Sequence, residues 1–134
     1  MEISHFDDLL MAARAQPEPQ RLLLVFASAS LPAGATAEQV AQFNAGESGE
    51  LAPSVCVDKD PHALADFSAL AEEAAGAGPP WALVFAAALS GLGGRPPGAS
   101  QVEAALQRMV EAVKAGNLSG LIPFDRQGVA VHLG

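Results

Sequence analysis

The chain has 134 residues, of which 50% are apolar and 16% are charged, and its formal net charge is −8. This length is close to the commonest domain size and is enough to bury a core without metal ions or disulfides. High apolar content and low charge exclude intrinsic disorder. We therefore expect a single α/β domain over residues 1–134.

Composition also restricts the partners and the compartment. The seven Lys and Arg residues are spread singly along the chain, whereas nucleic acid and anionic membranes are bound by clustered basic residues. Cys56 is the only cysteine, so no internal disulfide forms. Acidic residues follow Met1 where a signal peptide is basic, and the apolar run 81–89 is about half a membrane span. We expect a cytoplasmic protein that binds neither nucleic acid nor membrane.

The first half of the chain alternates helical and strand patterns. Residues 4–13 combine a capping-box pattern at Ser4 with an apolar stripe at helical spacing, which predicts a helix that ends before Pro17. Residues 22–27 form a continuous apolar run that is typical of a strand covered on both faces. Residues 36–43 begin with a second capping-box pattern and predict a short helix.

The same alternation continues after residue 54. Val55–Val57 predicts a short strand, and Asp60 is expected to cap a helix that begins at Pro61 and that Gly76 and Gly78 terminate. Trp81–Leu89 predicts a second buried strand.

The C-terminal part predicts one helix and a hairpin. Ser100 and Glu103 form a capping-box pattern for a helix that Gly116 ends. Residues 121–124 and 129–133 read as strands joined by a turn at 125–128. Since Pro123 has no N–H group, its strand is expected at a sheet edge or with a bulge.

This order of elements predicts the fold class. Strands that alternate with helices are typical of right-handed crossovers and parallel strands. We therefore expect a two-layer or three-layer α/β sandwich with a mainly parallel sheet of about 4–5 strands and a C-terminal antiparallel hairpin. Strands 22–27 and 81–89 are expected side by side, running in the same direction.

A parallel sheet would gather three connections at one rim, because ligands bind at the carboxyl ends of its strands. These connections are residues 28–34, 58–62 and 90–98. Gly93, Gly94 and Arg95, in the last of them, could hold an anion with backbone N–H groups and a guanidinium. The segment lacks the third glycine of a dinucleotide motif and the Gly-Lys-Ser/Thr of a P-loop, so a plain flexible connection is the alternative.

Two residues of the second connection are candidates for chemistry. Asp58 could act as a base, and Lys59 could bind an anionic group or join an acid–base pair. In the structural alternative, Asp60 caps a helix and Lys59 neutralises the two acids. Cys56, between two valines, is expected to be a buried small hydrophobe.

We expect neither a metal nor a cofactor. His5, His62 and His132 lie far apart in the sequence, and none has ligand spacing to another. A Gly-x-Ser-x-Gly elbow is also missing from the sequence.

Several strings resemble a family of short proteobacterial proteins, some of which carry the label "ribonucleotide reductase alpha subunit". The strings are residues 3–10, 16–23, 56–59, 87–91, 106–112 and 123–128. None belongs to a catalytic motif. The labelled enzyme is similar to a much larger barrel with a radical cysteine and a reducing cysteine pair, so a chain with one cysteine is not that catalytic subunit. A role as its partner or regulator stays open.

Two hypotheses of different classes follow. The first is a non-catalytic interaction or regulatory domain, with a protein partner or a second copy bound through the C-terminal strand, because an apolar edge strand invites pairing. The second is a small-molecule protein or enzyme whose rim binds an anionic ligand through Lys59 and Arg95, with Asp58 as base. The lack of any convergent constellation in the sequence favours the first.

Overall fold

The computed structural model describes residues 3–30, 50–78 and 81–131. Their elements, in chain order, are α1 (Phe6–Arg14), β1 (Gln20–Ser30), β2 (Glu50–Lys59), α3 (Phe67–Ala77), β3 (Leu83–Ser90), α4 (Ala99–Ala115) and β4 (Ile122–Phe124). The four strands form one sheet in the order β2-β1-β3-β4. The helix predicted at 36–43 lies outside the described residues.

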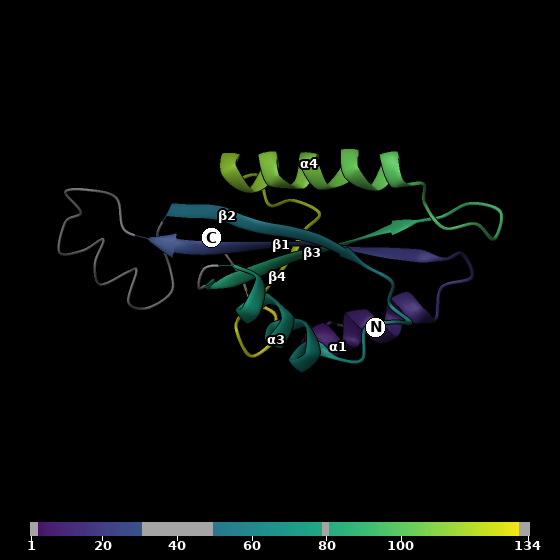
Figure 1. Ribbon diagram of the computed structural model, residues 1–134, viewed down its shortest axis with the longest axis horizontal. Coiled ribbons are helices and arrows are strands. Elements are labelled where there is room, and N and C mark those ends of the chain that lie inside the picture. Colours follow the sequence, from purple (N-terminus) through teal and green to yellow (C-terminus); the bar gives the residue numbers. More distant parts are fainter. Residues whose placement is uncertain (1–2, 31–49, 79–80, 132–134) are drawn as a thin grey trace.

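The predicted parallel sheet is wrong, because every neighbouring pair of strands is antiparallel. β1 and β3 do lie side by side, but Leu22 faces Ala88 and Phe26 faces Val84, so the two strands run in opposite directions. Residues 22–27 are at most 3% exposed because α4 covers one face of the sheet and α1 and α3 cover the other (Figure 1). The continuous apolar run therefore correctly predicted that both faces of the strand are buried, but it carries no information on the direction of the strand.

The helical connection between β2 and β3 explains why the alternation was misleading. Both strands are antiparallel to β1, so they run parallel to each other, with α3 between them in the sequence. β1 lies between them in the sheet. This arrangement is a split β-α-β unit, in which the crossover passes over an antiparallel strand.

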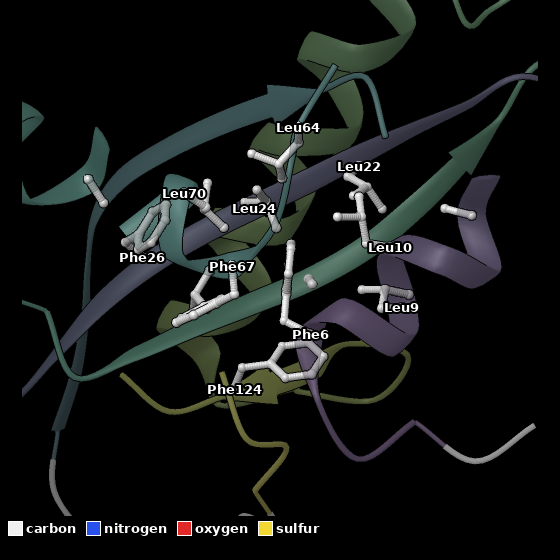
Figure 2. Close-up of a cluster of buried hydrophobic side chains, with 14 of the residues drawn as sticks. Phe6, Leu9, Leu10, Leu22, Leu24, Phe26, Leu64, Phe67, Leu70 and Phe124 are labelled. Atoms are coloured by element: carbon white, nitrogen blue, oxygen red, sulfur yellow. The ribbon is translucent and has the colours of Figure 1, made fainter. Parts of the chain in front are cut away.

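Two apolar clusters, one on each face of the sheet, form the core. The larger one, shown in Figure 2, joins α1, α3 and β4 to the sheet through aromatic contacts. The ring centroid of Phe6 lies 5.4 Å from that of Phe124 and 5.5 Å from that of Phe67. The other cluster packs α4 on Leu23, Val25 and Phe85. Since both faces are buried, the fold is a three-layer sandwich.

The α1 helix begins close to the predicted position, but its cap is His5 and not Ser4. The amide of Asp7 donates to His5 Nδ1 at 3.0 Å, and His5 Nε2 lies 3.0 Å from the carbonyl oxygen of Gln127. The carboxylate of Asp8 accepts from the backbone amides of Ser4 and His5. These backbone bonds hold the pKa of Asp8 below its ordinary value of 3.8. The N-terminal cap therefore ties the helix to the turn at 125–128.

The predicted helix start at Pro61 is wrong, because α3 begins six residues later at Phe67. The carboxylate of Asp60 accepts from the amide of His62 and supports only a turn. The Arg14 guanidinium donates to the carbonyl oxygen of Pro61 at 2.8 Å and to that of Leu64 at 2.6 Å. Long-range bonds to this turn therefore replace the predicted first turns of the helix.

The capping box predicted at Ser100 and Glu103 is wrong, because α4 begins at Ala99 with Gly98 as its N-cap. The predicted end of α4 is confirmed. Gly116 has a φ of 74°, and the amide of Asn117 donates to the Ala112 carbonyl at 2.9 Å. Only glycine adopts this left-handed conformation without strain.

The C-terminal hairpin is shorter than predicted. β4 is the last strand of the sheet, so the edge position predicted for Pro123 is confirmed. The predicted turn is also present, since the amide of Gly128 donates to the Asp125 carbonyl at 3.0 Å. Residues 129–131 form only isolated bridges, to His5 on one side and to Phe124 on the other. His132 and the rest of the predicted strand lie outside the described residues.

Candidate functional site

A groove with a volume of about 670 Å³ lies between the edge strand β2 and the flank of α4. This volume is within the usual range for ligand sites. The loop before α4 closes one end of the groove with Pro96 and Pro97, and most of the lining is apolar. The remaining lining residues are Arg21, Cys56, Asp58, Ala99, Val102, Glu103, Leu106, Gln107 and Val110.

The floor of the groove is the α4-facing side of β2. Cys56 is exposed there, so its predicted burial is wrong. Its register partner in β1 is Val25, which is fully buried under α4. The difference arises because β1 is an inner strand and β2 is an edge strand. A Val-Cys-Val pattern cannot distinguish these positions.

One ion pair lies at the end of the groove. The Nε atom of Arg21 donates to Asp58 Oδ2 at 2.5 Å, and both side chains are about one-third exposed. Each charge therefore neutralises the other, and Asp58 is held as an acceptor. In this arrangement it is not a free base.

The α4 side of the groove is an apolar stripe with one acid. Leu106 and Val110 are half-buried and pack against the smaller core cluster. Glu103, one turn before Leu106, is exposed, and within the described ranges it has neither an ion pair nor a side-chain hydrogen bond. The groove is therefore apolar along its length and acidic at its rim.

The two candidate residues of the 58–62 connection do not meet. Adjacent residues of a strand point to opposite faces. Asp58 lies on the α4 side, whereas Lys59 Nζ binds both carboxylate oxygens of Glu73 on α3, at 2.5 and 2.7 Å. The structure therefore separates these residues by the thickness of the sheet.

The glycine-rich connection forms a tight turn. Gly93 and Gly94 have φ values of 63° and 78°, and the Leu92 amide donates to the Arg95 carbonyl at 3.0 Å. The amide of Gly94 donates to Glu18 Oε2 at 2.8 Å. The N–H group of Gly94, which was predicted to bind an anionic ligand, is therefore bonded to a carboxylate of the chain itself. Arg95 is exposed on the turn.

The predicted rim is only partly assembled. The connections at 58–62 and 90–98 do share one end of the sheet, because the start of β1 pairs with the ends of both β2 and β3. Ser28 lies at the opposite end, beside Ala52, and residues 31–34 lie outside the described residues. Since β1 runs opposite to its neighbours, its carboxyl end cannot join theirs.

Residues 16–21 lie at this end of the sheet in the position predicted for residues 28–34. They were not predicted to be part of the rim. They line a hollow of about 440 Å³ together with Asp60, His62 and Gly94. The two prolines in this segment were interpreted only as a helix stop. The signal that could have found it is the position of the segment directly before a buried strand, which becomes informative once the strand direction is known.

The described residues contain neither a cluster of metal ligands nor a membrane-spanning helix. Over residues 3–30, 50–78 and 81–131, no three or more His, Cys, Asp or Glu side chains gather as metal ligands. Of the helices in those ranges, none has the length and apolar character needed to cross a bilayer.

Comparison with family models, with curated proteins and with solved structures found no match to the chain.

Proposed function

We propose that this chain is a non-catalytic interaction domain of the cytosol, and that the groove between β2 and α4 is where it binds a protein partner. The observation that carries the proposal is an apolar groove beside an edge strand, with half-buried Leu106 and Val110 along its wall. Binding of a partner removes apolar surface of this kind from water, which lowers the free energy of the complex.

The charges near the groove support an interaction domain over an enzyme for anionic substrates. Arg21 in the groove is bound to Asp58, and Lys59, on the opposite face of the sheet, is bound to Glu73, so neither cation is free for an anion. Asp58 is correspondingly engaged and does not act as a base. Catalysis would require a nucleophile that converges with a general base, and the groove lining places neither a His nor a Lys beside the Cys56 thiol.

We place the contact on β2 and not on the C-terminal strand. The described part of that strand is bonded on both sides, since the amide of Ala130 donates to the Ser4 carbonyl and that of Val131 to the Pro123 carbonyl. The homodimer through residues 129–133 stays a prediction, which light scattering at micromolar concentration tests.

Labelling of the single thiol at the floor of the groove tests whether a partner binds there. Cys56 is labelled with a bulky maleimide, and the labelled chain is used to capture partners from native cytosol. We expect the label to abolish capture, because it fills the groove without any substitution in the core. We also expect a bound partner to slow the reaction of Cys56 with a small disulfide reagent.

A matched control carries the same label elsewhere on α4. Ala104 is exposed and lines a different surface hollow, so a chain with Cys56→Ser and Ala104→Cys places the label outside the groove. This control is expected to capture partners as the unlabelled chain does. Equal capture by the two labelled chains would refute the assignment of the groove.

A further inference from the structure

We infer that the partner binds as an additional β-strand along the outer edge of β2, and that this strand carries a Lys or Arg that pairs with Glu103. The inference rests on the proposed function and adds the mode of binding and the chemistry of the bound segment. It follows from the sheet order, the shape of β2 and the charges around the groove.

The open main-chain groups of β2 are the first argument. β2 is the terminal strand of the sheet, and no described strand pairs with its outer edge. An edge strand presents a row of unpaired N–H and C=O groups. An extended segment that adds to such an edge gains main-chain hydrogen bonds, while its side chains enter a neighbouring groove. The groove lies directly beside this edge.

The irregularity of β2 limits where a strand can be added. The register between β1 and β2 shifts at Phe26/Ala27, opposite residues 53–55 of β2. Pro53 has no N–H group to donate. The regular part of the edge is therefore Val55–Lys59, which matches the length of an ordinary strand of about five residues. It includes Cys56 and Asp58, whose side chains lie in the groove.

The α4 wall determines which side chains the added strand needs. Successive residues of a strand point to opposite faces, so every second residue of the segment would point toward α4. Those residues would contact Leu106 and Val110, which are half-buried without a partner. The bound segment should therefore have apolar residues at alternate positions.

The charges select a basic segment. Arg21 and Asp58 cancel each other, which leaves Glu103 as the unbalanced charge among the described groove residues. The chain as a whole carries −8. A second copy would bring the same acid and the same net charge to the contact, so like-charge repulsion opposes self-pairing. A Lys or Arg on a different protein meets complementary charge instead.

A displayed library of random twelve-residue peptides, selected on the immobilised full chain, supplies the probe. We expect the selected peptides to alternate apolar residues and to contain a Lys or Arg. They should also slow the modification of Cys56 by the disulfide reagent. Selection of no peptide above background, or of peptides without a basic residue, would overturn the inference.

N-methylation of the peptide backbone tests strand addition directly. Only every second N–H of an added strand donates to β2. One set of peptides is methylated at odd-numbered positions and the other at even-numbered positions. One of the two sets should bind at least about tenfold more weakly than the parent peptide, a difference of about 1.4 kcal/mol, and the other set should bind about as tightly as the parent. Equal weakening of binding in the two sets of peptides would overturn strand addition. If those peptides still protect Cys56, the proposed function survives, whereas peptides that bind without protecting Cys56 refute both.

Charge reversal tests the pairing with Glu103. The Glu103→Lys variant should bind the selected peptide about tenfold more weakly, and a Lys→Glu change in the peptide should restore most of that loss. Glu111→Lys is the matched control, because Glu111 is exposed on the same helix and lines another hollow. Equal losses with the two variants, or no restoration by the exchanged peptide, would overturn the assigned pairing.

Discussion

The antiparallel pairing of β1 with β3 leads to a direct cross-linking prediction. Gln20 and Ser90 are register partners, and Gln20 Nε2 donates to Ser90 Oγ at 3.0 Å. Directly opposite residues of an antiparallel pair have Cα atoms about 4.5–5.5 Å apart, which is within disulfide range. In a Cys56→Ser background, the pair Gln20→Cys and Ser90→Cys should therefore form a disulfide on mild oxidation.

A second cysteine pair provides the opposite expectation. Ser28 lies eight residues after Gln20, the register partner of Ser90, so it lies eight strand residues from Ser90 along the sheet. At 3.4 Å per residue this separation is about 27 Å, far beyond the roughly 7 Å limit between Cα atoms for a disulfide. The pair Ser28→Cys and Ser90→Cys should not cross-link within one chain. In a parallel sheet the two results would be exchanged.

The assay is mass spectrometry of the oxidised chain, followed by urea unfolding with Trp81 fluorescence as the reporter. Trp81 is the only tryptophan and is 9% exposed. The Gln20–Ser90 bridge closes a loop of roughly 70 residues, so chain entropy alone stabilises the fold by about 4 kcal/mol. Cross-linking of the Ser28 pair in preference to the Gln20 pair would refute the antiparallel register and the position of the groove.

Three further predictions concern the N-terminal cap and the core. Phe6→Ala should destabilise the fold by about 3–5 kcal/mol in urea unfolding, against about 0.5 kcal/mol or less for the exposed Met11→Ala; similar losses would refute the aromatic cluster. Gly128 has a φ of 83°, and an added Cβ would lie 2.8 Å from His5 Nε2. Gly128→Ala should therefore cost about 1–2 kcal/mol or more, and an unchanged melting temperature would contradict this turn geometry. Because the pKa of Asp8 is lowered from 3.8, its carboxylate stabilises the fold above that pH and loses this effect as the pH falls through the folded value. Asp8→Asn should thus melt earlier at pH 7, with a difference that disappears in acid; a constant difference would refute it.

Local signals in the sequence were the most dependable. Gly116 ends α4 with the left-handed cap that its position predicted, and the predicted turn at 125–128 is closed by a bond from the Gly128 amide to the Asp125 carbonyl. These features depend on the conformations available to a few adjacent residues. The start of α3 is not determined by adjacent residues alone, because Arg14 of α1 donates hydrogen bonds to the carbonyl oxygens of Pro61 and Leu64.

The candidate site was predictable only in part. Asp58 was predicted as a site residue, and the connections at 58–62 and 90–98 were predicted to lie together. The groove was not predictable, because it depends on which strand lies at the edge of the sheet and which helix flanks that strand. Leu106 is half-buried next to β2 because the sheet order leaves that strand at the edge.

The sequence by itself determined that residues 22–27 form a strand buried on both faces, since six consecutive apolar residues require apolar cover on each side. Only the tertiary structure decided that this strand runs opposite to both neighbours, and that β2 is left at the edge with Cys56 exposed. The physical reason is that apolar burial has no direction, and backbone hydrogen bonds are satisfied in parallel and antiparallel ladders alike.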